Sequence, residues 1–146
     1  MQQHLKFFIN GEWVDPAVAN SFDVINPATE EAFAQISMGS KADVDKAVAA
    51  AKAAFPAYSK WSVHDRVALL ERIIDLYKKR CDEVAMVISL EMGAPITLAR
   101  NEQAAVGISH FKSALKALKH FQFEKEEDGV ILRYESIGIC GLITPW

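Results

Sequence analysis

The sequence predicts an α/β fold, and three features of its 146 residues point to this class. Near the N-terminus, short segments alternate between apolar and polar residues, as half-buried strands do. Longer stretches in the middle of the chain repeat their apolar residues at helical spacing. Finally, residues 137–144 form an almost unbroken apolar and β-branched run, which is typical of a strand covered on both faces in a parallel sheet.

Two tight hairpins are expected near the start of the chain. Asn10-Gly11 lies between two apolar runs, and this pair accepts the positive φ angles of a type I′ turn. A second pair of alternating segments, residues 21–25 and 31–37, is separated by the turn-forming residues 26–29. We expect these four segments to form a small β-meander.

Three helices are expected to follow the strands. The first two begin with a serine three residues before an aspartate, Ser40 with Asp43 and Ser62 with Asp65, which is the spacing of a capping box. We expect the first helix to end at Pro56, because proline lacks the N–H that a helix needs. The second is expected to end at Gly93 and Pro95, and the third carries apolar residues from Val106 to Leu118.

The residues after the third helix predict a charged turn and then a strand. Residues 124–129 are almost all charged and end in glycine, and residues 130–135 alternate between two faces. One face of that strand carries Ile131 beside Arg133 and Glu135. This pattern fits a subunit contact and a solvent-facing edge equally well.

Composition excludes several classes of function. Contents of 51% hydrophobic and 24% charged residues indicate a globular protein. The formal net charge of −3 disfavours nucleic acid and anionic membrane as partners, because phosphate binding needs clustered lysine and arginine. Two cysteines are too few for a disulfide framework or a zinc site. The N-terminus has no signal-peptide layout and no apolar stretch approaches ~20 residues, so we expect a cytoplasmic protein.

The residues alone supply no catalytic constellation. The sequence has no phosphate-binding glycine loop and no zinc-protease motif. Cys140 lies within the apolar run and Cys81 on a helix stripe, where burial would leave both thiols unreactive. His110 and His120 are expected to be partly buried helix residues, and Glu91, in the turn before Pro95, is either a solvated carboxylate or a ligand. From its residues alone, the chain is therefore expected to end beside the ligand crevice of an α/β sheet.

Five segments, in this order and spacing, resemble the N-terminal part of the NAD(P)-dependent aldehyde dehydrogenase superfamily. Each segment alone is a weak signal, but together they cover essentially the whole chain. The segments are Phe8-Ile-Asn-Gly-Glu-Trp13, Val24-Ile-Asn-Pro-Ala-Thr29, Asp43-Val-Asp-Lys-Ala-Val48, Glu91-Met-Gly-Ala-Pro95 and Ile137-Gly-Ile-Cys-Gly-Leu-Ile-Thr-Pro-Trp146.

The resemblance implies three parts in the chain. Residues 1–128 would be the N-terminal part of the dinucleotide-binding domain, and residues 129–137 an oligomerisation strand that pairs with a neighbouring subunit. Residues 138–146 would be the first core strand of the Rossmann-like dinucleotide-binding sheet, truncated here. Ser136 stands where the family usually has proline, a mild departure. A homodimer or homotetramer is implied for the whole protein.

The resemblance also implies where the cofactor binds. In the family, the strand that ends at Ile143, Thr144, Pro145 and Trp146 lines the dinucleotide cleft, so these four residues are the cofactor-contact candidates. The last groups of a strand have no ladder partners and are free to meet a cofactor. NAD is the expected cofactor and NADP is possible, because the residues that read the ribose are not among these 146.

Two further implications concern a cation and the substrate. Some members hold a monovalent cation through main-chain oxygens near the positions of Ile25 and Glu91. The helix containing Val106 and His110 resembles the one that borders the substrate tunnel.

The family mechanism places its reacting groups outside this sequence. A cysteine thiolate attacks the aldehyde, an oxyanion hole stabilises the thiohemiacetal, a hydride passes to NAD(P), and a glutamate activates water. The oxyanion-hole asparagine would directly follow Trp146, and the cysteine and glutamate would lie further on. The chain alone is therefore expected to be inactive and to expose apolar surface from Ile137 to Ile143, whereas the parent protein oxidises an aldehyde to a carboxylic acid.

Two other readings stay open. The chain could be a non-catalytic interaction or oligomerisation fragment. Alternatively, the parent could be a semialdehyde dehydrogenase or a dehydrogenase that acylates coenzyme A.

Overall fold

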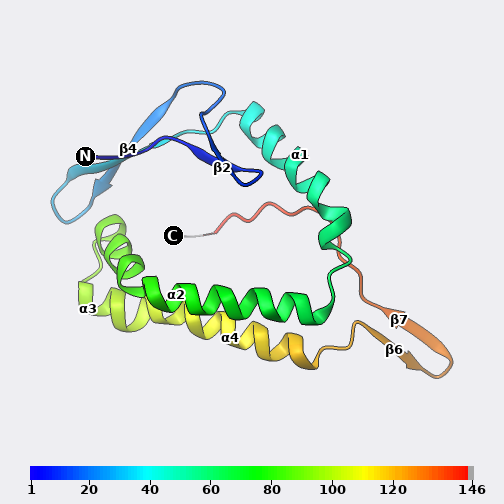
Figure 1. The fold of residues 1–146 in the computed structure, drawn as a ribbon. Helices are drawn as coiled ribbons and strands as arrows, with labels where there is room; N and C mark the ends of the chain where they lie inside the picture. The colour runs from blue at the N-terminus through cyan, green and yellow to red at the C-terminus, as the bar shows by residue number, and fades with distance from the viewer. Residues whose placement is uncertain (145–146) are drawn as a thin grey trace.

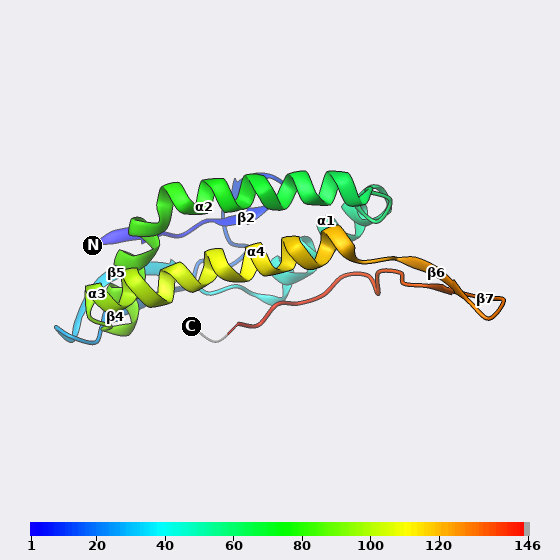
Figure 2. The same ribbon diagram turned by 90° about the horizontal axis from the view of Figure 1, so that it is seen from below.

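The computed structural model describes residues 1–144, an open assembly of short strands and long helices (Figure 1). The strands lie at one end of the chain and in a projecting hairpin, and two long helices run side by side between them (Figures 1 and 2). The α/β class is confirmed. The elements of the N-terminal half are β1 (Gln2–His4), β2 (Phe7–Ile9), β3 (Glu12–Val14), β4 (Ser21–Asn26), β5 (Glu31–Ser37), α1 (Lys41–Tyr58) and α2 (Val63–Met92). The remaining elements are α3 (Ile96–Leu98), the π-helical turn η1 (Ala99–Ala104), α4 (Ala105–His120), β6 (Glu124–Glu127) and β7 (Val130–Arg133).

Both expected hairpins form. Asn10 and Gly11 adopt φ angles of 55° and 82° between β2 and β3, which confirms the type I′ turn. The expected single meander is wrong, because β2 and β3 form a sheet of their own while β4 pairs with β5. A strand that the sequence pattern did not reveal, β1, pairs in parallel with β5, so the three-stranded sheet has the order β1-β5-β4. β1 is polar and only three residues long, too short to show an alternation.

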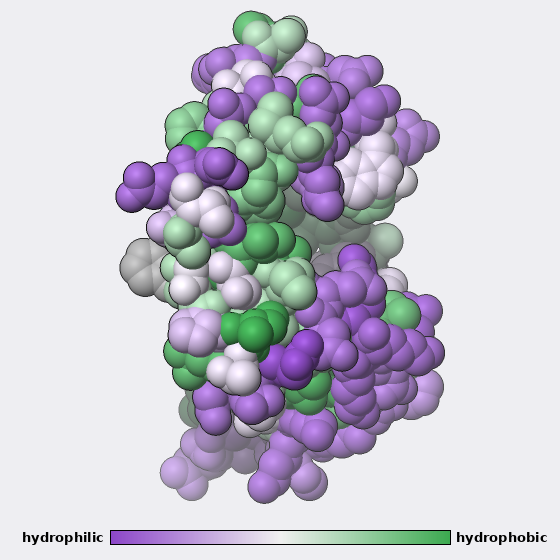
Figure 3. Space-filling model, turned by 90° about the vertical axis from the view of Figure 1, so that its left-hand side faces the viewer, coloured by the Kyte–Doolittle hydropathy of each residue, from purple (hydrophilic) through white to green (hydrophobic). Residues whose placement is uncertain are grey.

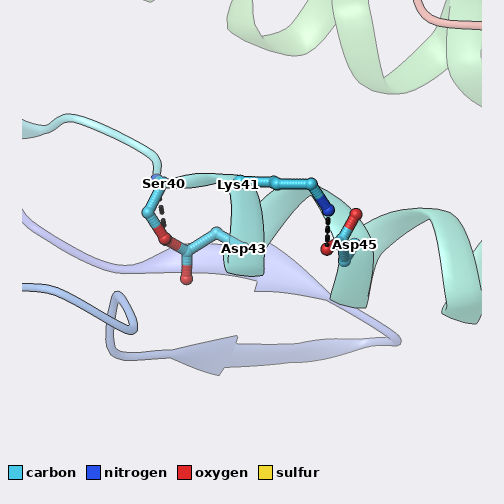
Figure 4. Close-up of polar contacts among 4 residues, drawn as sticks. All are labelled: Ser40, Lys41, Asp43 and Asp45. Atoms are coloured by element: carbon cyan, nitrogen blue, oxygen red, sulfur yellow. Dashed lines mark hydrogen bonds and ion pairs between the residues drawn. The ribbon is translucent and has the colours of Figure 1, made fainter.

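The start of α1 is held by a buried carboxylate. Asp43 accepts hydrogen bonds from the Ser40 N–H (2.9 Å), the Ser40 hydroxyl (2.6 Å) and the Ala17 N–H (2.8 Å). Figure 4 shows the Ser40 side chain directed at this carboxylate, beside the exposed Lys41–Asp45 ion pair. These hydrogen bonds, that of the Ser40 hydroxyl first, hold the pKa of Asp43 below its ordinary value. Asp43 thus caps the helix and also ties it to the loop before β4.

The lowered pKa of Asp43 makes a prediction about acid stability. A carboxyl with a lower pKa in the folded state stabilises the protein above its unfolded pKa of about 4, and this stabilisation is lost as the pH falls through the folded value. Asp43→Asn should lower the melting temperature at neutral pH, because only one acceptor oxygen remains and the NH2 group that replaces the other faces a backbone N–H donor. Asparagine does not titrate, so stability should also fall less steeply with acid than in the wild type. Thermal unfolding between about pH 2 and 7 checks this, with Asp45→Asn as the exposed control. Equal acid limbs in all three proteins would contradict it.

The helix ends agree with the sequence in one case and not in the other. α2 ends at Gly93, whose φ of 71° and N–H bond to the Ser89 carbonyl (3.0 Å) form a left-handed C-cap, as expected. α1 does not end at Pro56 but continues to Tyr58. A proline this close to a C-terminus removes only one helical hydrogen bond, and the helix stops two residues later.

A small alanine core fixes α2 against the segment that follows it. Ala85, Ala99 and Ala104 have 0% exposed surface, and Cys81, Ile88 and other apolar residues pack around them. Ala99 and Ala104 bound η1, a π turn that the sequence pattern did not predict. Side chains this small let the backbones of α2 and η1 approach each other closely, which sets the position of α4.

The prediction of a charged turn over residues 124–129 is wrong, because β6 occupies the first four of these residues. The turn consists only of Asp128 and Gly129, with φ angles of 51° and 78°. Glu124 is a strand residue because it lies opposite Arg133, and the two side chains form an ion pair at 2.8 Å that raises the pKa of Arg133. The hairpin projects from the helices, and every residue of β7 is exposed (Figures 1 and 2).

The expected core strand 138–146 is not formed in the described part of the chain. Residues 134–144 have no regular secondary structure, and Ile137 and Ile143 are 94% and 98% exposed. Cys140 is exposed as well, so its expected burial is wrong. The physical reason is that a strand exists only with a hydrogen-bonded neighbour, and none of the strands in residues 1–144 pairs with this run. The expectation of exposed apolar surface from Ile137 to Ile143 is confirmed.

None of the helices within residues 1–144 combines the length and the apolar character needed to cross a bilayer.

Candidate functional site

The expected cofactor residues lie at the end of the terminal segment. This segment leaves the β6–β7 hairpin and runs back along the helices (Figures 1 and 2). Ile143 and Thr144 are exposed, and no hydrogen bond within residues 1–144 engages their backbone. Pro145 and Trp146 lie outside the described residues. The structure therefore leaves the main-chain groups of Ile143 and Thr144 available, and it does not bring them against another candidate.

The start of the same segment lines a hollow of about 720 Å³ between the ends of α1 and α4 and the start of α2. Its walls are largely aromatic: Phe121 packs edge-on against Phe123 and Tyr134, with ring centroids 4.8 and 5.2 Å apart. Trp61 also lines the hollow, and its ring is tilted by 56° against that of Tyr58, with the centroids 5.1 Å apart. This hollow lies where the chain leaves the hairpin and begins the terminal segment.

Arg66 has a structural role that no sequence pattern predicts. Its Nη2 donates to the carbonyls of Tyr58 (3.1 Å) and Ser59 (3.3 Å), and its Nε donates to the carbonyl of Trp61 (3.3 Å). The guanidinium also lies over the Tyr58 ring, 5.0 Å from its centroid. Arg66 therefore closes the loop between α1 and α2, and no spacing or motif marks a lone arginine for this task.

A second hollow, of about 500 Å³, separates the three-stranded sheet from the C-terminal half of α2. Figure 3 shows this side of the molecule, where hydrophobic side chains gather between the upper and lower parts. The apolar residues that line this second hollow are Val24, Phe33, Ala34, Ile36, Met86, Val87 and Leu90. Glu91 stands at its rim with Asp82 and Glu83, so one wall is acidic.

Both expected cation residues lie at this corner. Ile25 sits on β4, an edge strand, where the register with β5 shifts between Val24 and Ile25. Glu91 lies in the last turn of α2 and not in the turn before Pro95, which corrects its expected place. A Cβ added at Gly93 would lie 2.9 Å from the Pro27 Cγ, so the end of α2 packs on the turn that follows β4.

The main-chain oxygens at this corner suit a weakly held cation better than the side chains do. The carbonyl of Glu91 has no helical partner, because the residue four places on is Pro95, which has no N–H. An edge strand such as β4 likewise leaves alternate carbonyls outside the ladder. Within residues 1–144, no group of three or more histidine, cysteine or acidic side chains could hold a metal ion.

The described residues contain no assembled nucleophile. Cys81 packs against the alanine core, Cys140 is exposed, and both are free thiols. His110 and His120 are exposed on α4, contrary to their expected partial burial. No hydrogen bond in residues 1–144 joins a histidine to a cysteine or serine, which is one arrangement that activates a nucleophile. This part of the chain can bind and position, but it shows no group prepared for covalent chemistry.

Comparisons with known proteins agree on one family. The sequence model described as "Aldehyde dehydrogenase family" matches residues 13–146. A curated relative from Staphylococcus aureus (strain bovine RF122 / ET3-1), named "Putative aldehyde dehydrogenase", is 42% identical over 146 residues, which is 100% of this chain and 31% of that protein. The chain thus spans about a third of the length of the curated relatives it matches.

Solved structures show the same similarity. An aldehyde dehydrogenase from Bartonella henselae is 47% identical with a TM-score of 0.84, over 86% of this chain and 26% of that one. A mutant of aldehyde dehydrogenase C from Pseudomonas syringae, in complex with NAD+ and octanal, is 44% identical with a TM-score of 0.84 over the same shares. The similarity covers the N-terminal portion of these structures. The chain therefore belongs to the aldehyde dehydrogenase family.

Proposed function

We propose that these residues are the N-terminal part of an NAD-dependent dehydrogenase that oxidises an aldehyde to a carboxylic acid through a cysteine thiohemiacetal. The observation that carries the proposal is the similarity at a TM-score of 0.84 to a solved aldehyde dehydrogenase in complex with NAD+ and octanal. Bound NAD would accept the hydride. The residues of this chain would contribute binding and positioning, and the reacting cysteine and glutamate would lie beyond Trp146.

The cofactor contacts are proposed at Ile143, Thr144, Pro145 and Trp146. The backbone groups of Ile143 and Thr144 have no partner in residues 1–144, which suits hydrogen bonds to ribose hydroxyls or to the nicotinamide amide. This proposal supposes that residues 138–146 become a strand when neighbouring strands are present. NADP is the alternative cofactor, and nothing in these residues discriminates the two.

A monovalent cation is proposed at the corner of β4 and α2, held by main-chain oxygens near Ile25 and Glu91. The support is the unpartnered carbonyl of Glu91 and the packing of Gly93 on Pro27, which brings the two segments together. An ion there would join the sheet to the end of α2, on the side of the molecule with the acidic rim.

The aldehyde is proposed to pass along α4, on the side that carries Val106 and His110. Both side chains are exposed, and they are four residues apart, so they share one face of the helix.

Two free cysteines and the absence of a disulfide among the described residues fit the reducing cytoplasm in which we expect the protein.

The β6–β7 hairpin is proposed to pair with a neighbouring subunit in a homodimer or homotetramer. A two-stranded hairpin with no sheet to join is marginally stable in water, and Val130, Ile131 and Leu132 are all exposed. A partner strand would satisfy the free edge and cover these side chains.

A lysine on β7 tests the pairing. In the full-length protein, Val130→Lys should shift the sedimentation profile toward the monomer, because a charge would enter the covered interface. Val18→Lys is the matched control, since Val18 and Val130 are 60% and 58% exposed and only the second is on the hairpin. An unchanged oligomer in Val130→Lys would refute the contact.

Enzyme kinetics test the function. The full-length protein should reduce NAD in the presence of straight-chain aldehydes, and residues 1–146 alone should show no activity with any of them. Adding coenzyme A separates the alternative, because a dehydrogenase that acylates coenzyme A would need it for turnover and release a thioester. No turnover of any aldehyde by the full-length protein, with either cofactor, would contradict the proposal and favour a non-catalytic interaction fragment.

A further inference from the structure

The π turn η1 is an irregular feature of the helical region that the proposed function does not use. A π turn closes its hydrogen bonds over five residues instead of four, so it inserts one extra residue between α3 and α4. Such turns are rare, are unfavourable without outside support, and are frequent at functional sites. This one also carries Gln103, whose Oε1 is buried without a donor among residues 1–144. Something must hold the turn, and its neighbours show what does.

Tyr77 of α2 reaches across to the end of the turn. Its hydroxyl donates a 3.0 Å hydrogen bond to the carbonyl of Ala104, the last residue of η1. The ring also lies near Phe111 of α4, with the centroids 6.3 Å apart. The polar bond therefore crosses between two helices at the point where the π turn gives way to α4.

Gly107 provides the space for this contact. A Cβ at Gly107 would lie 2.5 Å from the Tyr77 Oη and 2.8 Å from its Cζ, distances that no real side chain tolerates. Glycine is a poor helix former, so its presence inside α4 indicates a packing reason. The phenol of Tyr77 thus occupies the place of a missing side chain, so a sliding or rotation of α4 would have to displace it.

This contact fixes which side chains α4 presents outward. If η1 became a regular α-helical turn, its extra residue would pass into the helix and α4 would rotate by about 100°, the turn per residue of an α-helix. Gly107 and Phe111 lie on the side of Tyr77, whereas Val106 and His110 form the neighbouring stripe, and Val106 is 45% exposed. A rotation of that size would replace the Val106 stripe with a different set of side chains.

We propose that Tyr77 and Gly107 lock the register of α4 and thereby set the aldehyde specificity of the enzyme. Tyr77 acts as a positioning residue, through α4, and has no contact with the reacting atoms. The lock involves only residues of this chain and does not depend on the proposed function. Its effect on specificity rests on the proposed function, in which the aldehyde passes along Val106 and His110.

Hydrogen exchange in the full-length protein tests the lock. Tyr77→Phe removes only the hydroxyl and should speed exchange of the amides of residues 99–110 by about fivefold, the equivalent of one hydrogen bond. Tyr58→Phe is the matched control and should leave these amides unchanged. Gly107→Ala should speed exchange further. Tyr77→Leu/Gly107→Ala should recover part of the loss, since leucine lacks the hydroxyl oxygen and the two ring carbons nearest Gly107. Wild-type exchange in Tyr77→Phe, or no recovery in the double variant, would overturn the lock.

Steady-state kinetics on a series of straight-chain aldehydes test the effect on specificity. In Tyr77→Phe, the ratio of kcat/KM for long and short aldehydes should change by up to about fivefold, the equivalent of the same hydrogen bond, while kcat for the shortest aldehyde and KM for NAD stay at wild-type values. A uniform fall for all aldehydes would mean a merely structural role and would overturn the specificity effect. Absence of turnover in the wild-type enzyme would refute the proposed function and the specificity effect together, and the exchange data would still decide the lock.

Discussion

The amides of residues 138–144 are expected to exchange at least about a thousandfold more slowly in the full-length protein than in the 146-residue chain. The run is continuously apolar and β-branched, yet Ile143 is 98% exposed and none of the strands among residues 1–144 pairs with it. Burial between neighbouring strands would give each amide a ladder partner, and core strands open only with the whole domain. Hydrogen exchange with mass spectrometry on both proteins measures the difference directly.

An internal control comes from α2 in the same digests. Its helix is capped at both ends, by Ser62 with Asp65 and by Gly93, in residues that belong to both proteins. Peptides from its centre should therefore differ far less between the two proteins than the peptide covering residues 138–144. Equal exchange of that peptide in both would show that the run is not an interior strand, and the cofactor contacts proposed at Ile143 and Thr144 would lose their basis.

Local signals in the sequence predicted local structure well. Asn10-Gly11 forms its turn because the two residues alone determine the φ angles. The serine–aspartate caps form because donor and acceptor are three residues apart, and Ser62 even accepts the Asp65 N–H at 3.1 Å in a complete capping box. Such features need no distant partner, so one sequence is enough to predict them.

Features that depend on distant residues could not be predicted in this way. The pairing of β1 with β5 joins residues about thirty positions apart, and a three-residue polar strand carries no pattern of its own. The strand β6 appears as a charged turn in the sequence because its stabilising partner, Arg133, lies on the next strand. The last carbonyl of η1, that of Ala104, accepts a hydrogen bond from Tyr77, which is 27 positions away. The same reason explains why residues 138–144 form no strand here.

The candidate site likewise depends on contacts between residues that are distant in the sequence. Only the family resemblance points to Ile25 and Glu91, and the structure brings their segments to one corner through the packing of Gly93 on Pro27. That contact joins residues far apart in the chain, so no local pattern contains it. Arg66 was missed because its partners are carbonyl groups, which leave no trace in a sequence.

Ala104→Leu is expected to destabilise the full-length protein by about 3 kcal/mol, the upper end of the usual cost of overpacking. Ala104, Ala99 and Ala85 have no exposed surface, and the π turn brings two backbones together at this point. Three additional carbons have no free space there, and Tyr77 already engages the carbonyl of Ala104. Urea denaturation measures the shift in midpoint, and the slope shows whether cooperativity is retained.

The same substitution at Ala117 is the matched control. Ala117 lies in α4, the helix that follows η1, but is exposed, so Ala117→Leu should change the free energy of unfolding by no more than about 0.5 kcal/mol. A large gap between the two variants would show that the close approach of α2 and η1, rather than helix propensity, decides stability in this region. If Ala104→Leu matched its control, the alanine core would have room to adjust, and α4 would be free to shift without breaking the Tyr77 contact.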